Sequence, residues 1–265
     1  MFDKTFEFVL FEEKDNVAYI TLNNPTQMNP MTTEIMHDLM ECLDYCEQSD
    51  SVRCIVFRGA GGNFSAGGNV KAMKERLDKG IYAAKVGIRA GGEFIMRLKT
   101  INKPTIAWIE GAAAGAGCSM AMACDFSIAA EDSKFVFAFV NIGYIPDGGA
   151  VYLLEKAVGP VKATELMMSG KKFTGAQASE WGMITEAVPA DQLEETVQKY
   201  IKKYSSGPSV AYGQLKKLIN DTCYKDLSLC MQGEVAAQDI CSRSEDHYAA
   251  VTAFCNKQRP EFRGC

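Results

Sequence analysis

Two short segments, 66–69 and 111–117, are rich in glycine and alanine. This composition allows backbone N–H groups to bind a ligand. Each follows an apolar, strand-like run and precedes a helical pattern. Small residues let backbone N–H groups point into open space, and a helix N-terminus adds partial positive charge. Two such donors aimed at one point would form an oxyanion hole. From the turns alone, a phosphate cradle and close strand–helix packing remain alternatives, although the sequence contains neither a P-loop motif nor a dinucleotide-binding GxGxxG motif.

A third candidate is the carboxylate of Asp147, in the segment IPDGG at 145–149. Pro146 restricts the backbone before it, and a helical pattern follows. On local sequence, Asp147 is an N-cap, because aspartate is favoured just before a helix starts. General acid–base catalysis is the alternative role for a carboxylate at such a position.

The elements that must position these residues alternate between strand and helix over the first two thirds of the chain. Apolar runs predict strands at 6–11, 17–22, 52–58, 104–109, 126–129 and 134–137, with a turn at 14–16. Helical periodicity predicts helices at 32–44, 70–79, 81–98, 118–124 and 148–157, and a mostly helical chain from 161 onward. This order predicts an α/β fold with crossover connections and a helical tail.

The composition of the chain restricts the classes of function. The 265 residues are 47% hydrophobic and 23% charged, with a net charge of −5, which fits a globular domain with a sizeable core. Nothing basic and clustered suggests a nucleic-acid partner. The first residues lack the pattern of a signal peptide, and no apolar run reaches ~18 residues, so we expect a cytoplasmic protein without a membrane span.

The 10 cysteines form no CxxC motif, and neither His37 nor His247 lies beside a cysteine cluster. Metal-binding sites of the zinc type need such spacing, so we expect no metal. Scattered cysteines in a chain of this length are typical of small buried side chains in a reducing compartment.

Five blocks of sequence together resemble the crotonase (enoyl-CoA hydratase/isomerase) superfamily. They are FSAGGNVKAM at 64–73, GAAAGAGCSMAMACDFSIAAEDSKF at 111–135, NIGYIPDGGAVYLL at 141–154, TGAQASEWGMITEAVP at 174–189 and FCNKQRPEF at 254–262. They occur in the family's order and span almost the whole chain. The resemblance implies the crotonase (ClpP-like) spiral of repeated ββα units over 1–200, and a C-terminal helical trimerisation region over 201–265.

The resemblance also implies which groups bind the substrate. The oxygen of a coenzyme A thioester would accept hydrogen bonds from the backbone N–H groups of Gly68 and Ala116, and no separate cofactor would be needed. Adenine and pantetheine would run past the first turn, and a basic C-terminal residue would reach a CoA phosphate, in one chain or from a neighbouring subunit. The residues implied in this binding are Gln27, Met28, Ala66, Gly67, Val70, Ser119, Phe139, Phe254 and Lys257; for Lys257 a solvated helix end is the alternative.

The sequence departs from the hydratase pattern at the acid–base residues. Hydratases of the family carry two glutamates, and the matching positions here are Ser119 and Phe139. Asp147 stands where several isomerases of the family have aspartate, so the resemblance favours the single-aspartate branch that includes the epoxyphenylacetyl-CoA isomerases. We therefore expect Asp147 to move a proton while a 3-enoyl-CoA becomes a 2-enoyl-CoA, with Phe137 and Phe139 walling the pocket.

Other functions within the superfamily stay open at this point. A hydratase or dehydratase with atypical acid–base residues is the first alternative. Asp147 as a nucleophile, as in aryl-CoA dehalogenases, lacks a histidine near the first glycine turn. A non-catalytic acyl-CoA binder or an RNA-binding relative is possible in principle, but the acidic composition counts against RNA. The family suggests a homotrimer or a dimer of trimers.

Overall fold

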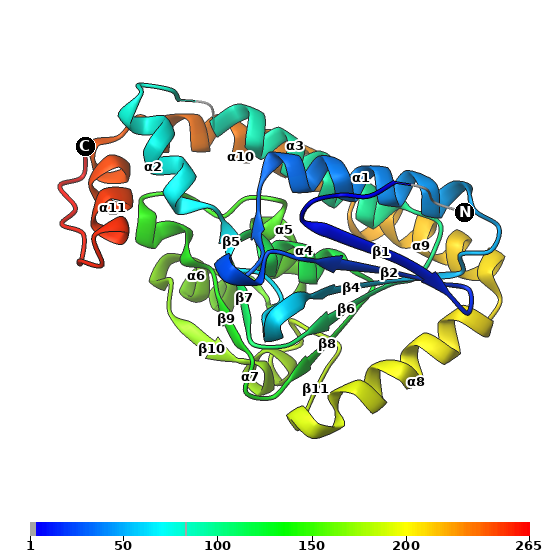
Figure 1. Ribbon diagram of the computed structural model, residues 1–265. Coiled ribbons are helices and arrows are strands. Elements are labelled where there is room, and N and C mark those ends of the chain that lie inside the picture. The colour runs from blue at the N-terminus through cyan, green and yellow to red at the C-terminus, as the bar shows by residue number, and fades with distance from the viewer. Residues whose placement is uncertain (1–3, 83) are drawn as a thin grey trace.

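The computed structural model describes residues 4–82 and 84–265 and is built around a six-stranded sheet (Figure 1). The strand order is β1-β2-β4-β6-β8-β11, in which only the β1–β2 pair is antiparallel. These strands are β1 (Val9–Lys14), β2 (Val17–Leu22), β4 (Cys54–Gly59), β6 (Thr105–Ile109), β8 (Phe126–Ala130) and β11 (Glu186–Val188). Parallel strands need crossover connections, and helices supply most of them.

Both faces of this sheet are covered, which explains why its central strands are nearly continuous apolar runs. On one face, Ala18 and Ile20 of β2 pack in the main core with Leu39 of α1 (Thr33–Gln48). On the other face, Val17 packs in a second cluster with Val197 of α8 (Leu193–Ser206). Figure 1 shows α8 below the sheet and α1 above it. The alternation of β2 residues between the two clusters follows from the period of two in a strand.

Two smaller sheets carry the glycine-rich segments. Strands β7 (Ala112–Ala114), β9 (Lys134–Val136) and β10 (Lys172–Thr174) form one, and β3 (Pro30–Met31) pairs with β5 (Gly67–Gly68) in the other. The expectation that 111–117 is entirely a turn is therefore wrong, because Ala112–Ala114 form a strand and Ala116 begins a helix. Alanine has a weak preference for strands, so β7 depends on its pairing with β9.

The remaining helices agree closely with the predicted ones, with shifted ends. They are α2 (Val70–Asp78), α3 (Ala84–Thr100), α4 (Ala116–Ala123), α5 (Ala150–Val158), α6 (Pro160–Ser169), α7 (Gly175–Glu180), α9 (Ser209–Cys223), α10 (Leu227–Cys241) and α11 (Glu245–Cys255), with 3-10 turns η1 (Pro25–Gln27), η2 (Ala60–Gly62), η3 (Ala138–Ile142) and η4 (Ala190–Gln192). Ala83, inside the predicted helix 81–98, lies outside the described residues. Thr32 caps α1 as expected, since its Oγ1 accepts a hydrogen bond from the Ile35 N–H at 3.3 Å. The predicted turn at 14–16 is present, with Asp15 and Asn16 both left-handed.

The C-terminal helices pack back onto the first part of the same chain. In Figure 1, α10 lies along α3, and α11 lies beside α2. The Lys216 ammonium on α9 binds the carboxylate of Asp125 at 2.7 Å, in a largely buried ion pair that joins α9 to the end of α4. The predicted division after residue 200 falls inside α8, and the trimerisation role of 201–265 stays a prediction.

Several expected absences concern the described residues alone. Within them, no helix combines the length and apolarity needed to cross a bilayer. The same part of the chain contains no group of three or more histidine, cysteine or acidic side chains arranged to hold a metal ion. All 10 cysteines are unpaired thiols, and those buried in the core are Cys42, Cys46, Cys54, Cys118 and Cys124.

Candidate active site

The first glycine turn is held by a short network of hydrogen bonds. The Ala66 N–H donates a hydrogen bond to the Met28 carbonyl oxygen at 2.7 Å, which fixes the backbone of the turn. The buried Ser65 hydroxyl donates to the Asn29 carbonyl at 2.8 Å, and its oxygen accepts from the Gly67 N–H at 3.1 Å. The turn is thus anchored on both sides, and it presents Gly68 just before α2.

The second glycine turn ends at the N-terminus of α4. Gly115 is the N-cap residue, with φ of 49°, and its N–H donates to the Val136 carbonyl at 2.9 Å. Ala116 is the first residue of the helix, so its N–H has no carbonyl partner within the helix. The ring of Phe139 faces this turn, because a Cβ added to Gly115 would meet a ring carbon at 3.6 Å.

The two turns touch each other through glycines. Gly67 has φ of +80°, and a Cβ placed there would lie 2.5 Å from the Ala114 oxygen and 3.2 Å from the Ala116 nitrogen. A Cβ on Gly117 would meet the Ser65 oxygen at 2.9 Å. Side chains at these positions would force the turns apart. The structure therefore brings the segment of Gly68 against the backbone of Ala116. That the N–H groups of Gly68 and Ala116 bind one oxygen stays a prediction.

Asp147 follows η3 and lies beside α4. The buried Ser119 hydroxyl, one turn along α4 from Ala116, donates to the backbone oxygen of Asp147 at 2.8 Å. Gly148 has φ of +64°, and a Cβ on it would lie 3.2 Å from the Ser119 Cβ. The interpretation of Asp147 as an N-cap is wrong, because α5 begins at Ala150 with Gly149 as its cap and without a side-chain cap bond. The residue is half-buried, and its carboxylate does not cap α5.

Gln238 of α10 fixes the carboxylate of Asp147. Its Oε1 accepts from the Ile145 N–H at 3.2 Å, and its Nε2 donates to the Ile145 oxygen at 2.9 Å. Because these two bonds determine which end of the amide carries nitrogen, the same Nε2 must face Asp147, where it donates to Oδ2 at 3.2 Å. One carboxylate oxygen of Asp147 is thereby held by the protein. The sequence analysis missed Gln238.

Glu234, one turn earlier on α10, is a second buried carboxyl group next to the same segment. It is 3% exposed, and its Oε2 accepts from the Gly149 N–H at 2.9 Å. Burial raises the pKa of Glu234 to about 7, with a further rise from the charge of Asp147 and an opposing effect of the Gly149 N–H. Burial likewise raises the pKa of Asp147 to about 6, against the hydrogen bond from Gln238.

The two positions that carry glutamate in hydratases contain groups that do not ionise near neutral pH. Ser119 is buried and bonded to the backbone of Asp147, and Phe139 is 7% exposed against the second turn. Phe139 therefore lies at the second turn, and its role as a wall of the site stays a prediction. Phe137 lies in the core instead, where its fully buried ring stacks on Phe173, at 6.2 Å between centroids.

The residues predicted to bind coenzyme A fall into two groups. Those of the first turn lie together: Met28 is left-handed and 47% exposed, Gln27 Oε1 accepts from Asn69 Nδ2 at 3.2 Å, and Val70 begins α2. Phe254 and Lys257 lie at and just beyond the C-terminal end of α11, with both side chains exposed. No hydrogen bond or ion pair among the described residues joins this second group to the first.

Comparison with known proteins identifies the family. A family model described as enoyl-CoA hydratase/isomerase matches residues 12–265. The chain belongs to this family. It is similar to the 1,2-epoxyphenylacetyl-CoA isomerase of Escherichia coli, with 34% identity over 261 residues that cover 97% of this chain and 99% of that protein. It is also similar to the trans-2-decenoyl-[acyl-carrier-protein] isomerase of Streptococcus mutans, with 29% identity over 98% of this chain and 99% of that protein.

Solved structures of the family agree with this assignment. The crystal structure of an enoyl-CoA hydratase from Mycobacterium avium subsp. paratuberculosis superposes with a TM-score of 0.89 and 29% identity, covering 98% of this chain and 100% of that one. The predicted crotonase fold and the resemblance to its isomerase-like branch are confirmed. An acyl-CoA substrate fits the family, whose members here are named both isomerases and hydratases.

Proposed function

We propose that this enzyme is an enoyl-CoA isomerase that shifts a double bond of an acyl-CoA thioester from the 3-position to the 2-position, with Asp147 as its acid and base. The observation that supports this most strongly is the environment of Asp147. Its carboxylate is held at one oxygen by Gln238 and lies beside α4, while Ser119 and Phe139 replace the two glutamates of the hydratase pattern.

The proposed reaction uses groups of this chain only, and the thioester is its substrate. The backbone N–H groups of Gly68 and Ala116 donate to the thioester oxygen. The Asp147 carboxylate takes a proton from carbon 2, and the electron pair of that C–H bond moves toward the carbonyl to give a dienolate. Protonated Asp147 then returns the proton at carbon 4, which leaves the double bond between carbons 2 and 3. Each oxyanion donor is worth about 2.7–4 kcal/mol of barrier.

The pKa of Asp147 suits this exchange of one proton. A pKa of about 6 leaves the carboxylate mostly ionised at neutral pH, yet makes it a stronger base than an aspartate in water. A group that must both take and return a proton works best when its pKa lies near the working pH. The apolar ring of Phe139 at the second turn keeps water from the dienolate, which favours return of the proton over hydration.

The coenzyme A moiety is proposed to lie along the first turn, past Gln27, Met28, Ala66 and Val70. Lys257 is exposed at the far end of α11 and is proposed to reach a CoA phosphate of a neighbouring chain in a homotrimer or dimer of trimers. A cytoplasmic location fits these assignments. Hydration or dehydration through Asp147 and an unusually placed water is the second candidate, supported by the hydratase among the structural relatives.

The test compares the wild-type enzyme with Asp147→Asn and with the control Asp191→Asn, an exposed aspartate on η4. Each is incubated with 3-enoyl-CoA and 2-enoyl-CoA in deuterated water, and the products are resolved by mass and double-bond position. We expect isomerisation by the wild type and the control, and a loss of about 10²–10⁴-fold in Asp147→Asn with unchanged thioester affinity. Undiminished turnover in Asp147→Asn would place the base elsewhere. A product heavier by one water would identify a hydratase, and thioester binding without turnover a binder.

A further inference from the structure

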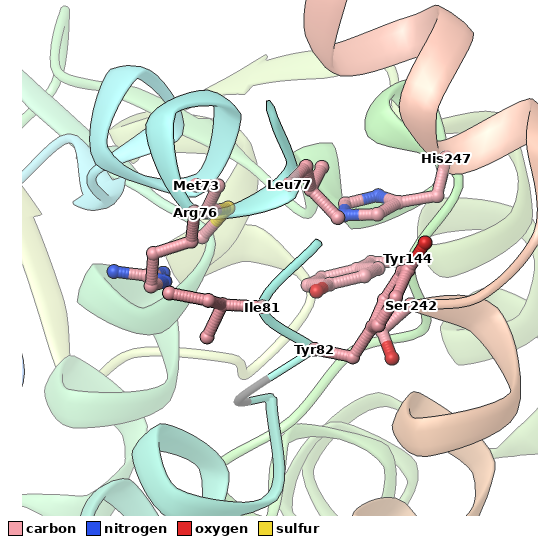
Figure 2. Close-up of a pocket in the computed structure, with 8 residues that line it drawn as sticks. All are labelled: Met73, Arg76, Leu77, Ile81, Tyr82, Tyr144, Ser242 and His247. Carbon is pink, nitrogen blue, oxygen red and sulfur yellow. The ribbon is translucent and has the colours of Figure 1, made fainter. Parts of the chain in front are cut away.

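A small cavity lies next to the proposed reaction site, between α2, the segment that follows it, and α11 (Figure 2). Its volume is about 20 Å³. A cavity needs roughly 10–15 Å³ by this measure to hold one water molecule, so this one accepts a group of about that size. Its walls are formed by Met73, Arg76, Leu77, Ile81, Tyr82, Tyr144, Ser242 and His247.

The cavity lies close to both the oxyanion turn and the segment of Asp147. Met73, on one wall, lies against the oxyanion turn, because its Cε would be 2.6 Å from a Cβ on Gly68. Tyr144, on another wall, precedes Asp147 by three residues. Burial raises the pKa of Tyr144 to about 12, and nearby charges act on it in opposite directions, Arg76 lowering it and Asp147 raising it. The cavity therefore lies beside both the segment that carries Gly68 and the segment that carries Asp147.

His247 contributes an unpaired hydrogen-bond acceptor to this cavity. Its Nδ1 lies 2.6 Å from the carbonyl oxygen of Ile142, which can only accept, so Nδ1 carries a proton. Burial lowers the pKa of His247, so the ring is neutral and Nε2 presents a lone pair. In the described part of the chain, Nε2 is one of two buried side-chain polar atoms without a hydrogen-bond partner. An unpaired buried polar atom is costly, which points to a ligand group that donates to it.

The position of the His247 ring is fixed from three sides. The ring stacks on Tyr144, with centroids 3.9 Å apart and planes at 12°, and Figure 2 shows it above Tyr144 and directed toward Leu77. The Ser244 hydroxyl caps α11 by accepting from the His247 N–H at 3.1 Å. A Cβ on Gly143 would lie 2.9 Å from the His247 Cα, so the helix is packed tightly there. The backbone and the ring of His247 are therefore held in place beside the cavity.

We propose that this cavity is the distal end of the acyl site and that His247 Nε2 accepts a hydrogen bond from a hydroxyl group on the acyl chain. The substrate class is then a hydroxylated enoyl-CoA thioester, since the cavity has room for one hydroxyl-sized group. The inference rests on the proposed function only in that an acyl thioester occupies the site. A bound water is the other possible donor, and the experiment separates the two.

The experiment measures binding, so that it does not depend on turnover. Short straight-chain enoyl-CoA thioesters of increasing length, each made with and without a hydroxyl on the terminal carbon, are titrated calorimetrically into the wild-type protein and into Asp147→Asn, which consumes no substrate. His247→Asn keeps an N–H near the place of Nδ1 for the Ile142 oxygen and removes the acceptor, whereas His247→Gln restores a polar group near Nε2. Tyr248→Phe, a neighbouring change at a half-exposed ring on the same helix, is the control.

At one chain length, we expect the hydroxylated thioester to bind the wild-type protein and Tyr248→Phe about 10-fold to 100-fold more tightly than its unsubstituted partner. His247→Asn should lose that preference, and His247→Gln should recover part of it. Equal affinities at every length would overturn the proposal and leave a water as the partner of Nε2. Failure of the proposed isomerisation would appear differently, as intact discrimination in binding without any shift of a double bond.

Discussion

Replacement of Gln238 by methionine tests how the protein sets the basicity of Asp147. Methionine has a similar volume but cannot donate to Oδ2. That bond lowers the pKa of Asp147 against the larger effect of burial, so its loss should raise the pKa above the present value of about 6. Because the base acts when ionised, the acid limb of the rate should move to higher pH.

The geometry of the bond from Gln238 indicates how large the shift in the pKa of Asp147 should be. A hydrogen bond to a charged group contributes about 1.5–3 kcal/mol, and about 1.4 kcal/mol corresponds to one pH unit. The bond from Gln238 to Oδ2 is 3.2 Å long, at the weak end of the usual range. We therefore expect a shift of about one pH unit, which would leave about half of Asp147 ionised at pH 7 instead of about nine tenths.

The assay is kcat/KM for isomerisation of a 3-enoyl-CoA between pH 5 and pH 9. The lost ionisation is recovered at high pH, so any deficit that persists at pH 9 measures displacement of the segment around Ile145, which loses two hydrogen bonds as well. Gln232→Met, an exposed change on the same helix, is the matched control. An acid limb that stays in place in Gln238→Met, with a uniform loss of rate, would refute the reasoning about pKa and leave Gln238 a purely structural role.

Two further changes test the turn and the second carboxyl group. Gly67→Ala places a Cβ 2.5 Å from the Ala114 oxygen and should reduce kcat by about 100-fold or more. The control is Gly62→Ala, which is also at positive φ but has no atom within 4 Å of the added Cβ, so it should reduce stability alone. Equal kcat values in the two variants would exclude a role of the turn contact. For Glu234, the folded-state pKa of about 7 exceeds the ordinary 4.5, so the folded protein holds the proton more tightly and loses stability as pH rises from about 4.5 to about 7. Glu234→Gln keeps an acceptor for the Gly149 N–H and should remove this loss of stability, which is on the order of 3 kcal/mol at pH 8. The free energy of unfolding is measured with urea at pH 4.5 and pH 8. If variant and wild type differ in that free energy by the same amount at both pH values, the prediction is contradicted.

The sequence predicted the parts of the site that depend on backbone conformation. Glycine and alanine between a strand and a helix indicate one of only a few kinds of local structure, so the two turns could be found without a structure. The strand β7 was missed, because its residues are alanines and pairing with β9, not intrinsic preference, makes them extended. The predicted role of Phe137 was wrong for a related reason: an aromatic residue near a site is equally suited to the core, and only packing against Phe173 decides.

The partners of Asp147 could not be predicted, because they come from a distant part of the sequence. Gln238 lies 91 residues from Asp147, in a helix whose periodicity predicts only packing. Local sequence favoured an N-cap role for Asp147, and the glycine at the actual cap carries no signal that excludes it. Gln238 and Glu234 lie four residues apart on one helix face, but their burial, which indicates that they have partners, is known only from the structure.

The proposed mechanism divides the enzyme's tasks between two parts of the chain. In this proposal, the glycine turns of the first part bind the carbonyl oxygen that every thioester has, through backbone atoms that tolerate few substitutions. In the same proposal, α10 and α11 supply the parts that differ between reactions. Gln238 and Glu234 set the environment of the proton carrier, and His247 binds the far end of the acyl group. Since these helices meet the core mainly through side chains, reaction and substrate can change there while the oxyanion turns stay the same. We therefore expect the turns to determine the class of ligand, and the C-terminal helices to determine which acyl group is used and which reaction it undergoes.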